Sequence, residues 1–360
     1  MRHLLVALSL GMAPMLATVP EATAQNSPSP RAAQAIPAAD AMASAMDAYR
    51  AQRYGEARLL ALPLAEKGDV AAQLMLGSIY NNGEGIASDR NEAAKWFGMA
   101  ADRGDASAQY ALGMLMEYGR IAGATPEAAR KLFQQAADQD HAGAATELGM
   151  MYTTGHGGPR DIGKAASLFE SAAKTGHADA QYYLGTLFAA GRGKPQNLDE
   201  AARYFRLAAD QGQPEASYQL GLMLQDGIGM SKSPAEAAKR FTIAAESGLP
   251  EAQTALAFAY LDGAGVERND TLAAKWFTEA AMRGEPLAQD RLARLYFLGQ
   301  GVARDVGAAL LWLTLAEKGG YEDETLRSAI EPEVTPEIRA RVADQIAKWD
   351  RAADSPPTAD

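Results

Sequence analysis

Few residues in this sequence have the types and spacing that could do chemistry, and two of them are histidines. His141 and His177 lie 36 residues apart, and a recurring pair of this kind could contribute ligands to a metal site. A zinc site needs further ligands, yet no C-x-x-C spacing accompanies the pair. The same register is elsewhere occupied by Asp69, Asp105, Gln213 and Glu285. We therefore interpret both histidines as solvated turn residues and expect no bound metal. His156, within Gly155-His156-Gly157-Gly158, is typical of a loop rather than of a catalytic base.

A second candidate is a serine nucleophile. Ser171-Ala172-Ala173-Lys174 fits the S-x-x-K pattern, and Lys174-Thr175-Gly176 fits the K-T-G pattern, of enzymes that recognise penicillin. In those enzymes the two lysines are different residues, and an S-D-N element completes the site. Here one lysine would serve both patterns and S-D-N is missing. A penicillin-interacting hydrolase is therefore the less favoured alternative, and we expect no enzyme activity, no catalytic residue and no cofactor.

Glycine pairs such as Gly83/Gly85 and Gly155/Gly157 might suggest phosphate-binding loops. Such loops follow a strand and open a helix, whereas these pairs lie between two segments with helical periodicity. Asp262, Glu267 and Asp270 near one pair do not follow the spacing of a calcium-binding EF-hand.

The residues that position these groups belong to a repeated unit. A leucine followed by glycine or alanine returns every 36 residues, at 76/77, 112/113, 148/149, 184/185, 220/221, 256/257 and 292/293. Seven copies in one register indicate a solenoid.

Each unit predicts a pair of helices. Apolar residues spaced by three and four form the first helix, and glycine ends it because glycine tolerates positive φ. One position then holds Asp89, Asp161, Asn197, Ser233, Asn269 and Asp305, which suit the cap of a second helix. That helix carries an aromatic residue such as Phe133 or Phe205 and a following alanine pair. A single hairpin cannot bury both faces, so the units must stack.

The pattern Ala-Gln-x-x-Leu-Gly-x-x-Tyr-x-x-Gly-x-Gly, then an acidic or amide residue, then Ala-x-x-Trp-Phe-x-x-Ala-Ala-x-x-Gly, resembles the Sel1-like repeat, a relative of the tetratricopeptide repeat with a longer loop. The resemblance covers roughly residues 69–320. It implies an all-α, right-handed αα-hairpin solenoid, and a non-enzymatic adaptor or regulator that binds a protein or peptide partner.

The flanking segments complete the predicted organisation. Residues 1–24 resemble a secretory signal peptide, with Arg2 and His3, an apolar stretch interrupted by Pro14, and an A-x-A site before Gln25. We expect cleavage there rather than a membrane anchor, and a periplasmic or secreted protein without a membrane span. Residues 25–40 are a predicted flexible linker, 41–68 a capping hairpin of tetratricopeptide type, 69–320 the seven repeats, 321–351 capping helices and 352–360 a disordered tail. In the capping helices, Ile338, Val342, Ile346 and Trp349 form an apolar stripe.

Composition limits the partners. The chain has 34 basic and 45 acidic residues, a net charge of −11, and therefore repels phosphate backbones, so we expect no nucleic-acid binding. The sequence contains no cysteine, so stability must come from packing between repeats rather than from disulfides.

The partner would lie on the side of the first helix that faces away from its own hairpin. In the related tetratricopeptide fold the equivalent positions line the concave groove, and by that analogy we expect a partner segment there. The predicted binding residues are Tyr110, Met114, Tyr182, Tyr218, Leu222 and Phe258. The alternative that neighbouring helices partly bury them stays open, and truncating them is expected to affect stability little. A structural part of a cell-envelope or polysaccharide assembly complex is the alternative function.

Overall fold

The computed structural model describes residues 38–354, which form α-helices and one short 3-10 helix and contain no strand. The predicted signal peptide, most of the predicted linker and the end of the predicted tail lie outside the described residues. Within residues 38–354, no helix is both long enough and apolar enough to cross a membrane.

Consecutive helices pair into hairpins. The first hairpin is α1 (Ala38–Arg50) with α2 (Tyr54–Glu66), and α1 begins three residues before the predicted hairpin boundary. The seven repeat hairpins are α3 (Val70–Asn82) with α4 (Arg90–Ala101), α5 (Ala106–Glu117) with α6 (Pro126–Ala137), α7 (Ala142–Thr154) with α8 (Ile162–Lys174), α9 (Ala178–Ala190) with α10 (Leu198–Ala209), α11 (Pro214–Asp226) with α12 (Pro234–Glu246), α13 (Pro250–Asp262) with α14 (Asp270–Met282), and α15 (Pro286–Leu298) with α16 (Val306–Lys318). We call the first helix of each repeat hairpin helix A and the second helix B. The chain continues through α17 (Glu324–Ile330), the 3-10 helix Glu331–Glu333 and α18 (Pro336–Asp354).

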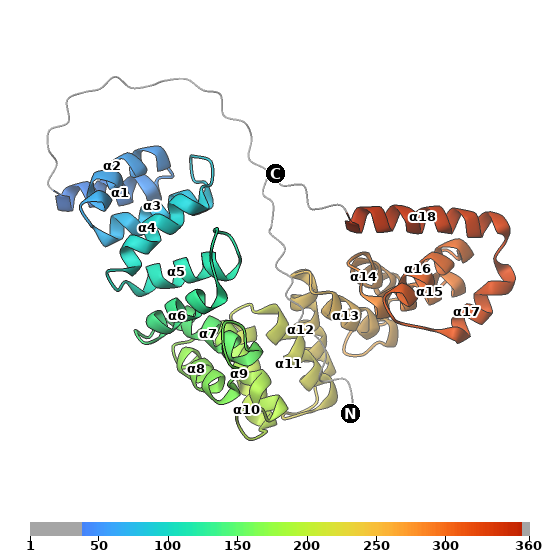
Figure 1. Cartoon of the computed structure of the whole chain (residues 1–360). Helices are drawn as coiled ribbons and strands as arrows, with labels where there is room; N and C mark the ends of the chain where they lie inside the picture. Colours follow the sequence, from blue (N-terminus) through green and yellow to red (C-terminus); the bar gives the residue numbers. More distant parts are fainter. Residues whose placement is uncertain (1–37, 355–360) are drawn as a thin grey trace.

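Each helix from α1 to α16 packs against the next helix in the chain. Figure 1 shows the hairpins following one another along a curved arc from the N-terminal to the C-terminal hairpin. The solenoid of helical hairpins predicted from the sequence is confirmed.

The repeated Leu-Gly pair has a steric cause. In every repeat from the second to the sixth, the helix B phenylalanine is almost fully buried; these are Phe133, Phe169, Phe205, Phe241 and Phe277. A Cβ added to Gly149 would lie only 2.6 Å from Cε1 of Phe169, and one at Gly113 would lie 2.6 Å from Cε1 of Phe133. Helix A therefore needs glycine where the ring of helix B lies against its backbone.

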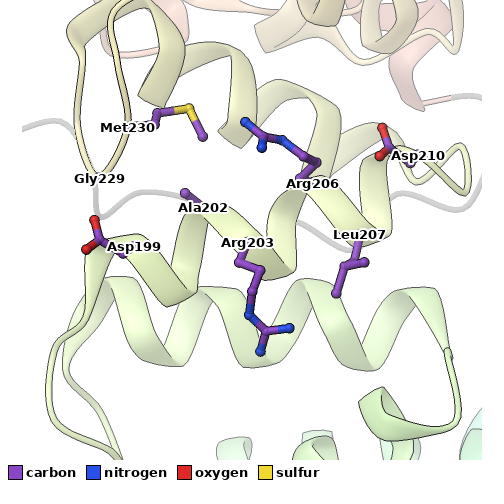
Figure 2. A pocket seen from close by; sticks show the side chains of 8 residues that line it. All are labelled: Asp199, Ala202, Arg203, Arg206, Leu207, Asp210, Gly229 and Met230. Carbon is purple, nitrogen blue, oxygen red and sulfur yellow. The ribbon is translucent and has the colours of Figure 1, made fainter.

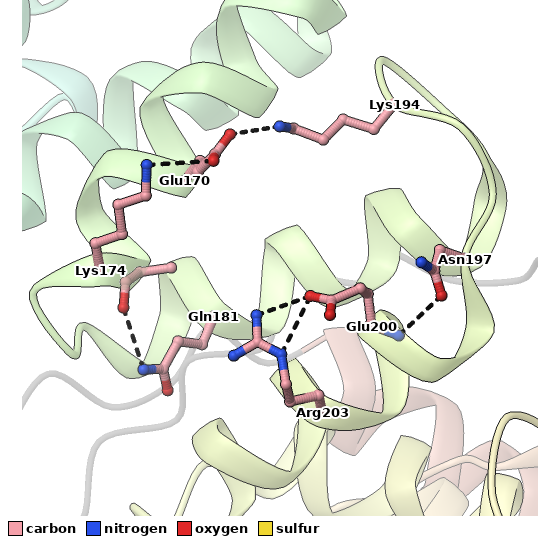
Figure 3. A network of polar contacts seen from close by, with 8 residues as sticks. Glu170, Lys174, Gln181, Lys194, Asn197, Glu200 and Arg203 are labelled. Carbon is pink, nitrogen blue, oxygen red and sulfur yellow. Dashed lines mark hydrogen bonds and ion pairs between the residues drawn. The ribbon is translucent and has the colours of Figure 1, made fainter.

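Side-chain caps begin most of the helices. Asn197 Oδ1 accepts the backbone N–H of Glu200 at 3.1 Å at the start of α10 (Figure 3). Asp89, Asp161, Asn269 and Asp305 do the same for their helices, as predicted. Ser233 is the exception, since its side chain makes no cap hydrogen bond to α12.

At most junctions between successive hairpins, a buried glutamine of helix A bonds the end of the preceding helix. Gln181 Nε2 donates to the carbonyl oxygen of Ala173, at the end of the preceding helix B, over 3.3 Å (Figure 3). Its Oε1 accepts from Gln211 Nε2 at 2.7 Å. The equivalent residues Gln73, Gln109, Gln253 and Gln289 bond the same carbonyl of their own junctions. These bonds set the orientation of one hairpin on the next.

The C-terminal end of the solenoid is covered by α18. Val342 is buried, and Ile338, Ile346 and Trp349 pack against the core of the last hairpins. The rings of Trp349 and Trp312 meet edge to face with centroids 5.7 Å apart. The predicted apolar stripe therefore lies against α16, while the helix itself extends to Asp354.

Candidate binding face on helix A

The six predicted binding residues lie on four A helices. Tyr110 and Met114 lie on α5, Tyr182 on α9, Tyr218 and Leu222 on α11, and Phe258 on α13. All six are half-buried. We call the side of α3 to α13 that carries them the helix A face.

The rings on this face are anchored in the core of their own hairpins. The centroids of Tyr110 and Phe133 are 6.0 Å apart, those of Tyr182 and Phe205 5.9 Å, and those of Tyr218 and Phe241 6.0 Å. Phe258 meets Phe277 edge to face at 5.1 Å. These residues are therefore partly buried by neighbouring helices, which is the alternative that the sequence left open. Truncating them would also remove core packing. We therefore now expect their truncation to lower stability as well, in place of the small effect predicted from the sequence.

A hollow opens on the helix A face between α3 and α5. Its volume is about 300 Å³, at the lower end of the range for small-molecule pockets. Tyr110 and Met114 form part of its wall, together with Ser78 and Asn81 of α3 and Arg120 of the loop after α5. This loop departs from the repeat, because the residue that caps the C-terminus of α5 is Tyr118 rather than a glycine with positive φ. The hollow could receive one or two side chains of a partner.

Residues at the repeat position of Tyr110 also contact the next repeat. Tyr110 stacks on His141 with ring centroids 4.7 Å apart. Two repeats of this register carry threonine, and there Thr146 Oγ1 lies 3.2 Å from His177 Nδ1 and Thr254 Oγ1 donates to Glu285 Oε2 at 3.3 Å. Sequence analysis did not predict these junction contacts.

The two histidines are helix caps. His141 Nδ1 accepts the backbone N–H of Ala144 at 3.1 Å, and His177 Nδ1 accepts that of Ala180 at 3.4 Å. Burial lowers the pKa of His141, which favours the neutral ring that such a cap requires. Within residues 38–354 no group of three or more His, Cys, Asp or Glu side chains is arranged to hold a metal. His156 Nε2 lies 3.4 Å from Oε1 of Glu117.

The penicillin-type motif lies on helix B. Ser171 is exposed on α8, and Lys174 Nζ lies 3.2 Å from Oε1 of Glu170, whose other oxygen bonds Lys194 (Figure 3). Thr175 ends the helix and donates its hydroxyl to the carbonyl oxygen of Ala172. The lysine of the motif is thus engaged by a carboxylate, and the Ser171 hydroxyl forms no hydrogen bond with any base among the described residues.

A second hollow, of about 240 Å³, lies on the helix B side beside α10 (Figure 2). Arg203, Arg206, Leu207 and Met230 line it. Two of its charged groups are engaged, since Arg203 bonds Glu200 at 2.7 Å and Asp210 pairs with Arg240 at 2.9 Å. The hollow is also smaller than the one on the helix A face, and it is therefore the weaker candidate.

Acidic residues of the helix A face were missed by sequence analysis. Glu147 on α7 is half-buried, and burial, with Glu117 and Asp179 nearby, raises its pKa to about 7. Burial, reinforced by Glu147, raises the pKa of Tyr110 to about 12. The available signal was the register that places Asp179, Glu215 and Glu251 at intervals of 36 residues.

Comparison with known proteins identifies the family of the repeated unit. The model of the Sel1 repeat matches seven consecutive segments, residues 70–105, 106–141, 142–177, 178–213, 214–249, 250–285 and 286–321. No curated protein matches the sequence.

Two solved structures are similar over most of the chain. One is c5321, a protective antigen present in uropathogenic Escherichia coli strains that displays an SLR fold, with a TM-score of 0.71 and 27% identity. That match covers 82% of this chain and 64% of the antigen's chain. The other is a Sel1 repeat protein from Oxalobacter formigenes, with a TM-score of 0.63 and 32% identity over 82% of this chain and 87% of that one. The chain belongs to the Sel1 repeat family, whose repeats generally serve as scaffolds for protein–protein interaction.

Proposed function

We propose that this protein is an exported, non-enzymatic scaffold or regulator that binds a segment of a partner protein along its helix A face. The observation that carries the proposal is the row of half-buried aromatic, leucine and methionine side chains on α5 to α13, with the hollow between α3 and α5 at one end. Tyrosine offers a large contact area with a polar tip, and methionine adapts to the shape of a partner.

The placement of the reactive residue types supports a role without catalysis. His141 and His177 are engaged as helix caps, and Lys174 of the S-x-x-K pattern is engaged by Glu170. Beside the hollow on helix B, Arg203 pairs with Glu200 and Asp210 with Arg240. The helix A face instead offers contact area with few internal polar bonds, which suits recognition of a polypeptide.

Matched apolar-to-glutamine variants test the binding face. The helix A variant combines Met114→Gln with Leu222→Gln, and the control combines Leu207→Gln with Ile243→Gln on helix B, where the two side chains are 40% and 41% exposed. We expect capture of the partner from a periplasmic extract to fall at least tenfold for the helix A variant and to stay unchanged for the control, at a temperature where circular dichroism shows both folded. Equal capture by the two variants would refute binding through the helix A face.

Export rests on the leader-like sequence of residues 1–24. The test is N-terminal sequencing of the protein recovered from fractionated cells. We expect a periplasmic or secreted protein that begins at Gln25. Recovery from the cytoplasm with Met1 intact would reject this location.

A further inference from the structure

Charge is segregated between the two helices of the hairpins. The helices α3, α5, α7, α9, α11 and α13 contain no lysine or arginine. Their acidic residues are Glu117, Glu147, Asp179, Glu215, Asp226, Glu251 and Asp262. By contrast, α4, α6, α8, α10 and α12 contain two basic residues each, and α14 contains one. Among the repeats up to the sixth, helix A is therefore exclusively acidic or neutral.

In these six repeats, the acidic residues of helix A form no ion pair with lysine or arginine among the described residues, whereas most of those on helix B do. On helix B, Glu92, Glu170, Glu200, Glu236 and Glu279 each pair with a lysine or arginine. Among the described residues, Glu147, Asp179, Glu215 and Glu251 form no ion pair, and Glu117 pairs only with His156. A buried oxygen of Glu117 and one of Glu251 have no hydrogen-bond partner. Leaving such a buried acceptor unpaired costs stability, so these carboxylates are not fully satisfied within the chain.

Tyrosine rings lie beside these carboxylates. Burial, reinforced by Glu215 and Glu251, raises the pKa of Tyr182 to about 12, and burial with Glu251 and Glu285 does the same for Tyr218. Tyr182 also packs on Tyr183 with ring centroids 5.3 Å apart. An aromatic face next to a carboxylate is the surface that lysine and arginine side chains recognise, through cation–π contact and charge-assisted hydrogen bonds.

The acidic surface ends at the seventh repeat. There α15 carries Arg291 and Arg294, and Arg294 pairs with Asp323. Asp290, in the register of Tyr182 and Tyr218, is fully buried, and Arg291 Nη1 lies 2.6 Å from one of its oxygens while the other oxygen has no partner. This change of sign limits the complementary stretch to α5 through α13.

Building on the proposed function, we propose that the partner segment is an extended polypeptide rich in lysine or arginine. Its cationic side chains approach Glu117, Glu147 and Asp179 and lie against the neighbouring tyrosine rings of α5 and α9. The apolar parts of the segment cover Met114 and Leu222. Neutral and acidic segments are disfavoured because they would leave the carboxylates desolvated without a counter-ion.

A direct test uses a fluorescein-labelled 12-residue peptide of alternating arginine and serine, and the same peptide with glutamate in place of arginine. Fluorescence anisotropy is measured on the full chain at pH 8 and about 0.15 M salt, where long-range attraction is largely screened. We expect the arginine peptide to bind and the glutamate peptide not to bind. Equal binding of both peptides, or none of the arginine peptide, would overturn the inference.

Matched charge variants separate site recognition from general attraction to a chain of net charge −11. One variant carries Glu117→Gln, Glu147→Gln and Asp179→Asn. The control carries Glu92→Gln, Glu200→Gln and Glu236→Gln, which removes three charges from helix B. We expect the Kd for the arginine peptide to rise at least tenfold in the first and less than twofold in the control. An equal rise in both would show non-specific attraction and refute the site.

The same triple variant distinguishes this inference from the proposed function. If the variant with Met114→Gln and Leu222→Gln loses partner capture while the Glu117/Glu147/Asp179 variant keeps it, the helix A face binds the partner but not through cations, and only the present inference fails. If capture survives in the Met114/Leu222 variant, the proposed function itself fails. Loss in both variants supports both proposals.

Discussion

At the scale of single residues, the buried ring of helix B limits the size of the helix A residue that it packs against. Phe169 is 1% exposed, and its ring lies where a side chain on Gly149 would begin. The sequence shows that leucine and glycine recur together but not why, because the ring comes from the other helix of the hairpin. Where alanine replaces this glycine, at Ala257 and Ala293, it is fully buried, so those two hairpins accommodate the extra methyl group.

Gly149→Ala should therefore destabilise the protein, although alanine is the better helix former. The added Cβ would lie 2.6 Å from Cε1 of Phe169, and overpacking of this kind costs about 1–3 kcal/mol, against a gain in helix propensity of up to about 1 kcal/mol. The control is Gly98→Ala on α4, where a Cβ meets nothing within 4 Å and stability should rise slightly. Urea unfolding measures both variants. A stabilised Gly149→Ala variant would show that the ring adjusts freely.

The half-buried carboxylate of Glu147 gives stability a pH dependence. Its pKa is about 7 in the folded chain, raised by burial and by Glu117 and Asp179, against 4.5 as the ordinary value. Folding therefore favours the protonated form, and this contribution is fully present below pH 4.5 and is lost as pH rises through 7. Glutamine cannot ionise, so Glu147→Gln should raise the free energy of unfolding at pH 8 by roughly 1–3 kcal/mol and change it little at pH 4.5. Melting temperatures at the two pH values give the comparison. A variant that is equally stabilised at both values would contradict this assignment.

At the scale of helices, the sequence predicted where elements begin but not how they lie against one another. Asp89, Asp161 and Asn197 cap their helices as their residue types indicate. The burial of Tyr110 depends in part on His141 of the next hairpin, on which its ring stacks. Helical periodicity gives only the direction of a side chain from its own axis, so the junction contacts could not be derived from it.

The caps of helix B provide a test at this scale. Asn197→Ala removes the bond to the backbone N–H of Glu200 and should cost about 1 kcal/mol of stability. Ser233→Ala, at the equivalent position of α12, removes no cap bond and should cost no more than a few tenths of a kcal/mol. Chemical denaturation of the two variants gives the comparison. Equal losses would mean that the residue type at the cap, rather than the observed hydrogen bond, sets the stability.

At the scale of the whole molecule, stability and recognition both follow from the linear order of hairpins. The helices of the repeats pack chiefly on their neighbours in the chain, so the molecule has a succession of small cores rather than one. The repeat period predicted this architecture because each unit has a face that only a neighbour can cover. The segregation of charge became visible only when every residue could be assigned to helix A or helix B.

Removing the C-terminal cap should consequently weaken one end of the solenoid and leave the other unchanged. Trp349 of α18 packs edge to face on Trp312 of α16, so Trp349→Ala should remove about 2 kcal/mol or more of local packing. Because repeats interact with their nearest neighbours, hydrogen exchange should become faster in α15 and α16. This increase should diminish toward α13 and be absent from α3 to α6. The control is Arg341→Ala. The Arg341 side chain is exposed, and its ion pair with Asp305 is long, at 3.9 Å, so its loss should change stability little. A uniform increase in exchange from α3 to α16 would show instead that the solenoid opens as a single cooperative unit.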